Sequence, residues 1–202
     1  MFIPPKYKNE NLTEVKEFLK ENAFAILVNQ VDGRPWATHI PLELEVDEQG
    51  KDLLVGHIAK ANPQWKHFEE GKEVLCIFNG PHSYVSSSWY VEEEVPTWNY
   101  VAVHVYGSLE VLDEEAVLES LHRLVDKYER QSAQPLSLYN LSDKTMRQIK
   151  GVVGFKIIIT EIEAAYKLSQ GREQDHERII GALKQRSQGA KEIASLMKKK
   201  QE

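Results

Sequence analysis

The sequence contains a single cysteine, Cys76, so no disulfide can form within the chain. No apolar run is long enough to span a bilayer. The first six residues, MFIPPK, lack the basic segment and the following apolar segment of a secretory signal. These absences predict a reduced, cytoplasmic protein with no membrane partner, in which Cys76 is a small core residue.

Motifs of several enzyme classes are also missing. The seven histidines form no HExxH motif and no CxxC pair is present, so no metal site is predicted. No glycine-rich phosphate loop follows the first predicted strand, which argues against a doubly wound dinucleotide-binding sheet. Residues 86–88 are serines near His82, but they lie outside any G-x-S-x-G elbow, so we interpret them as turn residues.

An overall excess of positive charge is lacking as well. The net charge of −6 argues against a globally basic nucleic-acid binder. Residues 184–202 differ, because they carry six basic and two acidic side chains, a net charge of +4. This segment either packs on the protein with its lysines in solvent or contacts phosphate as an arm, and solvated lysines are the more common case.

The most informative stretch that is present covers residues 73–107. It begins with the apolar run 74–78 and ends with the alternating run 100–106, both rich in β-branched and aromatic side chains. Asn79-Gly80-Pro81 and Val95-Pro96 predict breaks in regular structure. The many aromatic side chains indicate a pocket wall, a subunit interface or a well-packed barrel corner.

Apolar periodicity predicts both strands and helices along the chain. Strands are predicted over residues 24–28, 36–46, 53–58, 74–78, 100–106 and 151–163, with a hairpin turn at 31–34. Helices are predicted over residues 12–22, 63–68, 113–128, 142–150, 175–183 and, after a break at Gly189, 190–200. We predict a mainly β fold, a small antiparallel barrel with peripheral helices. The predicted domains are 1–171, the barrel with N-terminal and inserted helices, and 172–202, a helical appendage.

One constellation of polar and aromatic side chains remains. Asn62-Pro63 is a helix-start signal beside Lys60, and free backbone N–H groups with a nearby ammonium favour an anion such as phosphate. Flavin mononucleotide, FMN, needs such donors for its phosphate, and apolar walls with edge hydrogen bonds for its ring. The constellation comprises Thr38, His39, His57, Lys60, Asn62, Trp98, Asn99, Tyr100, Lys167, Ser169 and Gln170.

Five segments make a family resemblance specific. They are ATHIPL at residues 37–42, GHIAKANPQW at 56–65, FNGPHSYVSSSWY at 78–90, VPTWNYVAVHVYG at 95–107 and KLSQGR at 167–172. Over nearly its whole length the sequence resembles the PaiB family, described as FMN-binding negative transcriptional regulators. Gly171 departs from the family pattern, in which asparagine is usual at this position.

The resemblance implies an FMN-binding split β-barrel of the pyridoxamine-phosphate-oxidase type, a homodimer with FMN in the groove between subunits. It places the phosphate near His57, Lys60 and Asn62, and the flavin ring near residues 38–40, which adds Ile40 to the cofactor-binding set. Residues 98–100 are implied to come from the partner chain.

Two function classes stay open. The resemblance favours a negative regulator of degradative-enzyme and sporulation genes, acting on DNA or through a transcription-associated partner. No helix-turn-helix stands out, however. The alternative is an FMN-dependent oxidoreductase acting on a small molecule, since the fold type includes oxidases and reductases. No substrate or nicotinamide site is indicated, so enzymatic activity stays undecided and no catalytic residue is predicted.

Overall fold

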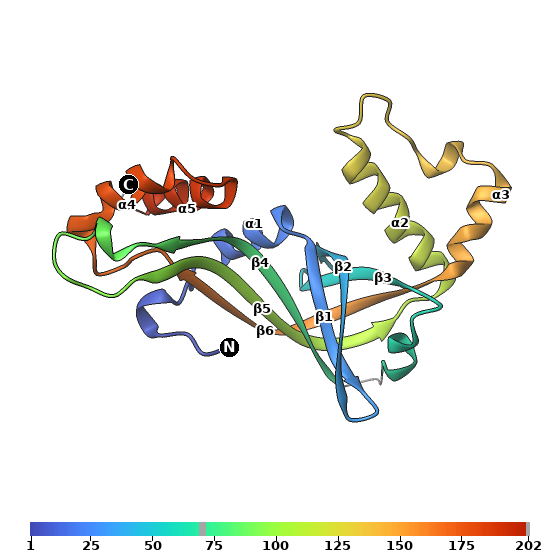
Figure 1. Cartoon of the computed structure of the whole chain (residues 1–202). Coiled ribbons are helices and arrows are strands. Elements are labelled where there is room, and N and C mark those ends of the chain that lie inside the picture. Colours follow the sequence, from blue (N-terminus) through green and yellow to red (C-terminus); the bar gives the residue numbers. More distant parts are fainter. Residues whose placement is uncertain (69–71, 201–202) are drawn as a thin grey trace. The chain divides into compact units, whose positions relative to one another are not determined.

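The computed structural model describes residues 1–68 and 72–200 of the chain (Figure 1). The strands in this part are β1 (Phe24–Val31), β2 (Arg34–Val46), β3 (Asp52–Ala59), β4 (Glu73–Val85), β5 (Thr97–Val111) and β6 (Val152–Lys167). The α-helices are α1 (Leu12–Glu21), α2 (Glu114–Glu129), α3 (Asp143–Met146), α4 (His176–Leu183) and α5 (Gln188–Lys199). Short 3-10 helices are η1 (Pro5–Tyr7), η2 (Pro63–His67), η3 (Ser87–Trp89), η4 (Leu138–Asn140), η5 (Arg147–Gly151) and η6 (Glu173–Asp175).

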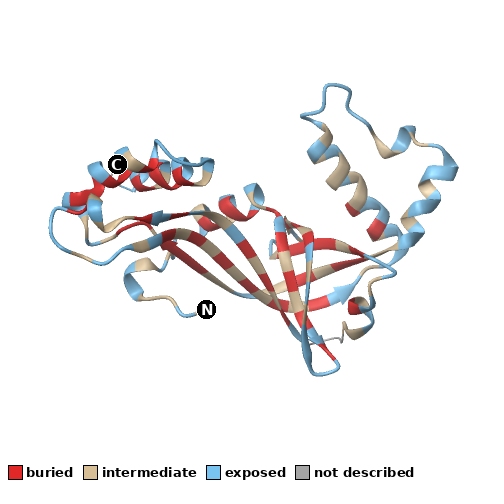
Figure 2. Cartoon of the chain, viewed as in Figure 1, coloured by how far each residue is buried: buried red, intermediate tan, exposed pale blue. Residues whose placement is uncertain are grey.

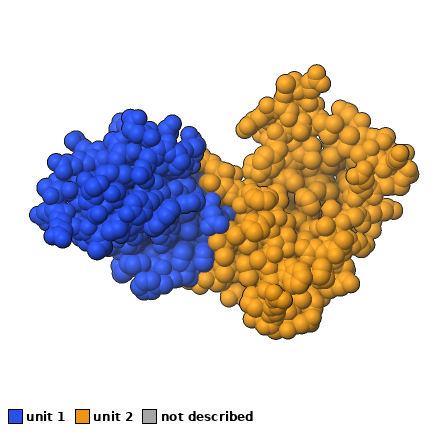
Figure 3. Space-filling view, viewed as in Figure 1, with its two compact units in different colours: residues 1–18, 78–104, 163–202 blue, residues 19–77, 105–162 orange. Residues whose placement is uncertain are grey.

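By compactness the chain divides into two units, coloured separately in Figure 3. The first unit comprises residues 1–18, 78–104 and 163–202, and the second comprises residues 19–77 and 105–162. The division predicted from the sequence, into a barrel domain of residues 1–171 and an appendage of residues 172–202, stays a prediction. In the structure, residues 172–200 belong to the first unit.

The six strands form a closed barrel in the order β1-β2-β3-β6-β5-β4. β1 and β2 form a hairpin that closes at the pair Val31–Arg34. Its two turn residues, Asp32 and Gly33, have φ of 50° and 78°, and a two-residue turn of type I′ needs positive φ at both positions. The hairpin predicted at residues 31–34 is therefore confirmed.

The second unit has its core inside the barrel strands. Along these strands buried residues either alternate with exposed ones or follow one another. The completely buried side chains of this core include Leu27, Leu42, Leu54, Phe155 and Ile157. Burying a side chain of this size contributes about 1.5–3 kcal/mol. Buried positions, red in Figure 2, also alternate along β5, as a strand with two different faces requires.

The first unit packs α5 against its own strands. Ala190, Ile193, Ala194 and Met197 lie on one side of α5 and are fully buried, while the lysines of this helix are exposed. The Met197 sulfur lies 3.6 Å from the Asn99 side-chain nitrogen on β5. Within the basic C-terminal segment, α5 is thus a packed helix whose own lysines are exposed.

The helix break predicted at Gly189 is wrong by several residues. α4 ends at Leu183, and α5 already begins at Gln188 with Ser187 as its N-cap. Gly189 lies in the first turn of α5, where a Cβ would approach the His82 carbonyl oxygen to 3.4 Å. Gly189 therefore lies within the helix, in a turn that packs on β4, and does not break it.

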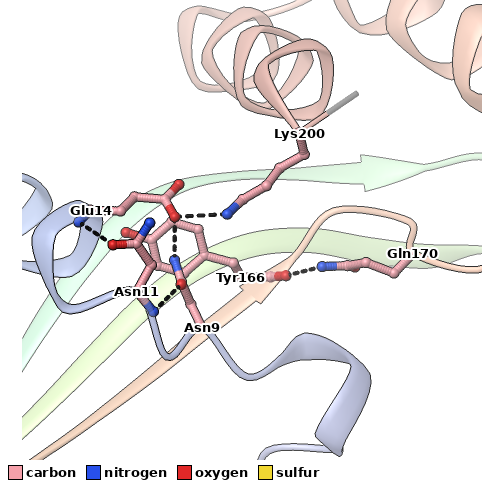
Figure 4. A network of polar contacts seen from close by, with 6 residues as sticks. All are labelled: Asn9, Asn11, Glu14, Tyr166, Gln170 and Lys200. Atoms are coloured by element: carbon pink, nitrogen blue, oxygen red, sulfur yellow. Dashed lines mark hydrogen bonds and ion pairs between the residues drawn. The ribbon is translucent and has the colours of Figure 1, made fainter. Parts of the chain in front are cut away.

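A polar network joins the start of α1 to the end of α5 (Figure 4). The Glu14 carboxylate accepts hydrogen bonds from the Asn9 amide at 2.8 Å and from the Lys200 ammonium at 2.7 Å. The Asn11 side chain caps α1 by accepting the Glu14 backbone N–H at 3.2 Å. These contacts hold the two terminal segments of the first unit together.

The break predicted at residues 79–81 is wrong, because β4 runs through them without interruption. The strand instead changes which side is buried. Cys76 and Phe78 are buried before this point, and Ser83 and Val85 after it, so the parity shifts by one residue. The predicted break at Val95-Pro96 is correct, since β5 begins only at Thr97.

Two residues explain why β4 tolerates Asn79-Gly80-Pro81. A Cβ on Gly80 would meet the Phe18 ring at 2.6 Å, so a glycine lets the strand pass close to α1. The ladder between β1 and β4 covers only residues 75–77 of β4. Pro81 lies outside that ladder, so the pairing with β1 requires no N–H from it.

Among the described residues, no helix is long and apolar enough to cross a membrane.

Candidate functional site

In the second unit, the predicted residues Thr38 and Asn62 are in direct contact. The Asn62 side-chain nitrogen donates to the Thr38 hydroxyl at 2.9 Å, which links β2 to the turn before η2. The Asn62 side-chain oxygen caps η2 by accepting the Gln64 backbone N–H at 3.0 Å. The structure therefore brings together one residue predicted near the flavin ring and one predicted near the phosphate.

The centre of this network is Gln64, which sequence reasoning missed. Its side chain is 0% exposed, accepts a hydrogen bond from the Thr38 hydroxyl and donates to the Asn29 side-chain oxygen at 2.9 Å. It also donates to the carbonyl oxygen of Leu27 at 3.3 Å. The sequence carried little signal, because a glutamine in a short turn is usually exposed.

Lys60 follows β3 in the turn before η2. Its backbone N–H donates to Gly151 at 2.8 Å, and its carbonyl oxygen accepts the Trp65 indole N–H at 2.9 Å. The side chain is exposed, and its ammonium has no ion-pair partner among residues 1–68 and 72–200. These two backbone hydrogen bonds fix the turn before η2, and the Lys60 ammonium stays available for a ligand.

His57 is half-buried on β3, opposite Gly154 of β6. Burial lowers the pKa of its imidazole below the ordinary value of 6.5, so the ring is neutral at pH 7 and offers one N–H donor. It lines a narrow cleft with Glu43, Glu45 and Ser120, a different cavity from the one that Lys60 lines.

The two other predicted residues of β2 face opposite sides of the strand. Ile40 is buried in the core, whereas His39 is exposed, with its ring centroid 6.4 Å from that of Phe24. Of residues 38–40, His39 is the one most open to solvent.

The first unit contains the other six predicted residues, and four of them line one pocket of about 260 Å³. Asn99, Ser169 and Lys167 reach it from β5, from the turn after β6 and from the end of β6. Gln170 also lines it. Trp98 and Tyr100 do not, because they project from the other face of β5.

Asn99 and Ser169 form the buried floor of this pocket. Asn99 is 0% exposed and donates to the Ser169 hydroxyl at 2.8 Å. Ser169 has φ of 63°, a left-handed conformation that is uncommon outside glycine, and its carbonyl oxygen lies 2.9 Å from the His176 ring nitrogen. These bonds offset the backbone strain and fix the turn.

Gln170 holds the same turn from inside. Its amide oxygen accepts the Leu168 backbone N–H at 2.8 Å, and its amide nitrogen donates to the Tyr166 carbonyl oxygen (Figure 4). Both polar atoms of the Gln170 side-chain amide are thus hydrogen-bonded to the backbone. Gln170 acts as a positioning residue here, and the next residue, Gly171, has φ of 79°, which glycine adopts freely.

Sequence reasoning missed most of the charged and aromatic wall of this pocket. Arg172 forms an ion pair with Glu94 and lies 4.9 Å above the ring of Tyr90. Burial is the main reason that the pKa of Tyr90 is raised, so its hydroxyl stays protonated as a donor. The ammonium groups of Lys6 and Lys167 lie 5.0 and 5.6 Å from the Tyr7 ring.

The charges of this pocket do not balance. Its lining contains three cationic side chains, from Lys6, Lys167 and Arg172, and one carboxylate, from Glu94. Glu94 is already paired with Arg172, so two positive charges are left for a ligand. The pocket is chemically suited to a phosphate or carboxylate group.

Trp98 lies on the exposed face of β5 and is 52% exposed. Its ring centroid is 6.1 Å from that of Tyr84 and 6.0 Å from that of His82. Tyr100 is half-buried on the same face of β5. Such a cluster of aromatic side chains is typical of a surface that another molecule covers.

No group of three or more potential metal ligands is found among the described residues. Each unit carries six of the twelve predicted residues. In the second unit these are Thr38, His39, Ile40, His57, Lys60 and Asn62, and in the first unit Trp98, Asn99, Tyr100, Lys167, Ser169 and Gln170.

Comparison with known proteins identifies a family and a fold. Residues 1–161 match the model of the family described as "Putative FMN-binding domain". The chain is 43% identical over 203 residues to "Protease synthase and sporulation protein PAI 2" of Bacillus subtilis (strain 168), covering 99% of this chain and 98% of that protein.

Two solved structures share the fold at low sequence identity. The flavocytochrome Anf3 from Azotobacter vinelandii has a TM-score of 0.61 and 19% identity, covering 79% of this chain and 69% of that one. An FAD and heme binding protein from Mycobacterium smegmatis has a TM-score of 0.61 and 17% identity, covering 80% and 73%. The predicted fold class, mainly β with peripheral helices in a flavin-binding split barrel, is confirmed.

Proposed function

Because the chain belongs to the family described as "Putative FMN-binding domain", we propose that it is an FMN-binding homodimer that lowers transcription of degradative-enzyme and sporulation genes. FMN is the cofactor that the family description names. The regulatory part is supported by 43% identity to a Bacillus protein whose name refers to protease synthesis and sporulation.

The cofactor site is proposed from the contact between Asn62 and Thr38, together with the Lys60 ammonium, which has no ion-pair partner within the described part of the chain. The second N–H of Asn62 and the Lys60 ammonium are both donors, as a phosphate dianion requires, whereas His57 lines a separate cleft with Glu43 and Glu45. The residues present therefore fit FMN. Bound FMN supplies reversible electron transfer, and the residues of this chain bind and orient it.

The predicted residues of the first unit have separate roles in this proposed function. Lys167 supplies positive charge, Asn99 fixes Ser169 from below, and Gln170 holds the turn in which both Ser169 and Lys167 stand. Trp98 and Tyr100 form part of the homodimer surface. His39 is proposed to contact the flavin ring from its exposed side of β2, while Ile40 supports that strand from the core.

Replacing Lys60 by alanine is expected to weaken FMN binding by roughly 1.5–3 kcal/mol, the scale of a charge-assisted hydrogen bond. Lys60→Arg keeps the charge and is expected to retain part of the affinity. The measurement is a titration of flavin fluorescence with the purified protein.

Lys66→Ala is the matched control for Lys60→Ala. Lys66 is an exposed lysine of η2, and it lines no cavity together with Lys60. Its removal should leave FMN affinity unchanged. Equal affinities for wild type and Lys60→Ala would remove Lys60 from the phosphate site.

The homodimer is tested at Trp98. A Trp98→Asp substitution puts a charge on the exposed aromatic face of β5, and we expect it to shift the protein from dimer to monomer in sedimentation at micromolar concentration. Tyr139→Asp is the control, because Tyr139 is exposed on η4 at 81%. A monomeric wild-type protein would contradict the dimer.

Repression is tested in cells that carry a reporter fused to the promoter of a secreted-protease gene. Expressing the chain should lower the reporter signal several-fold, and Lys60→Ala should relieve that repression if FMN is required. Unchanged reporter output, combined with FMN-dependent oxidation of NAD(P)H by the purified protein, would favour an oxidoreductase instead.

A further inference from the structure

The second unit contains a cavity of about 540 Å³, and Lys60 is the one lining residue that the proposed function uses. Its walls come from α2, from η5, from the end of β5 and from the start of β6, with Trp65 of η2 at one side. Pockets of about 300–1,000 Å³ are typical of small-molecule sites.

The wall of this cavity is preformed. A Cβ on Gly154 of β6 would meet the Val117 side chain of α2 at 2.5 Å, so helix and strand are in close contact. The Leu112 backbone N–H donates to the Gly154 carbonyl oxygen at 2.9 Å, which fixes the chain between β5 and α2. A ligand would therefore meet a rigid surface and lose little free energy in ordering it.

The lining is mostly apolar and is left in contact with solvent. Val111 is 53% exposed and Leu118 is 36% exposed, and both line the cavity. Met146, Ile149 and Trp65 are half-buried around them. A ligand with an apolar body would remove this surface from water, at about 25 cal/mol for each Å² covered.

Two lysines at the cavity carry positive charge that the described protein does not neutralise. Lys60 and Lys150 both line it, both are exposed, and neither ammonium has an ion-pair partner among residues 1–68 and 72–200. One carboxylate, from Glu114, also lines the cavity. The lining therefore has one more positive than negative charge.

We propose that this cavity binds an organic acid, a single carboxylate on an apolar aromatic or aliphatic body. The apolar body lies against Leu118, Met146 and Ile149, and the carboxylate accepts a charge-assisted hydrogen bond from Lys150. The site shares only Lys60 with the proposed FMN site, so Lys150 and Leu118 test it separately.

The probe is anilinonaphthalene sulfonate, which combines an anionic group with apolar rings and fluoresces in apolar surroundings. We expect saturable binding that decanoate displaces. Lys150→Glu should weaken both ligands roughly tenfold or more, the loss of one charge-assisted hydrogen bond. Leu118→Asp should abolish binding, because it places a negative charge against the apolar body and the carboxylate.

Lys144→Glu is the matched control. It makes the same charge change on an exposed lysine of α3 that does not line the cavity. Circular dichroism and thermal melting establish that all three variants are folded. Unchanged probe affinity in Lys144→Glu, with a loss in Lys150→Glu, supports the site.

Four results would overturn the inference. Equal weakening by Lys144→Glu and Lys150→Glu would show attraction to general positive charge. Failure of decanoate to compete, with a change in sedimentation caused by Leu118→Asp, would make the cavity a protein contact. Loss of FMN affinity in Lys150→Glu would make it part of the cofactor site, whereas normal FMN affinity with no probe binding would refute this proposal and leave the proposed function intact.

Discussion

Substituting alanine for Gly107 is expected to destabilise the protein by about 3 kcal/mol or more. Gly107 lies in β5, and a Cβ there would be 2.3 Å from the Ile158 carbonyl oxygen and 2.7 Å from the Ile157 side chain. The first of these neighbours is backbone of β6, which cannot move away without breaking the sheet. The expected measurement is a large fall in the denaturant concentration at the unfolding midpoint.

The control for Gly107→Ala is Gly181→Ala. Gly181 lies on the exposed side of α4, and a Cβ there would meet nothing within 4 Å. Alanine has the higher helix propensity, so this variant should gain about 0.5–1 kcal/mol of stability. If both variants unfolded at the wild-type midpoint, the close approach of β5 and β6 at Gly107 would be refuted.

Replacing Gln64 by alanine is expected to cost about 3 kcal/mol of stability and to weaken FMN binding as well. The Gln64 amide joins Thr38, Asn29 and the Leu27 carbonyl oxygen, and its removal takes away the hydrogen bond to the buried Asn29 side-chain oxygen and the acceptor of the Thr38 hydroxyl. An unsatisfied buried group costs about 1–3 kcal/mol. FMN affinity should fall because Thr38 and Asn62 lose the side chain that orients them.

Gln30→Ala is the control for Gln64→Ala, because it removes a glutamine side chain that is exposed rather than buried. Gln30 is an exposed glutamine on β1, next to Asn29, and its removal should change stability by less than about 0.5 kcal/mol. Urea denaturation and flavin titration of both variants form the experiment. A Gln64→Ala protein as stable as Gln30→Ala would show that the network around Gln64 contributes nothing.

Local signals predicted much of the fold. The hairpin at residues 31–34 needs only Asp32-Gly33, and the helix starts at Asn62 and Asp113 need only a capping side chain, which accepts a backbone N–H in both cases. The path of β4 through Asn79-Gly80-Pro81 was not predictable in this way. It depends on Phe18, about 60 residues away, to which Gly80 gives room.

The candidate site was harder to predict because its residues meet only in three dimensions. Trp98 and Lys167 were singled out by type and motif, but the pocket that Lys167 lines also includes Lys6 and Tyr7, far away in the sequence. Gln64 was difficult for another reason. It is a buried amide, and no sequence pattern indicates which amide a fold encloses.

The first unit is built from segments that lie far apart in the sequence, and this determines when a newly synthesised chain can fold it. The Asn9 backbone N–H donates to the Ala164 carbonyl oxygen at 2.9 Å, and Glu14 pairs with Lys200. At ribosomal rates the partners of the first residues appear roughly 10–30 s after those residues. During that interval Val15 and Phe18, buried in the folded protein, are accessible to chaperones, so the first unit can be completed only after synthesis has passed residue 163.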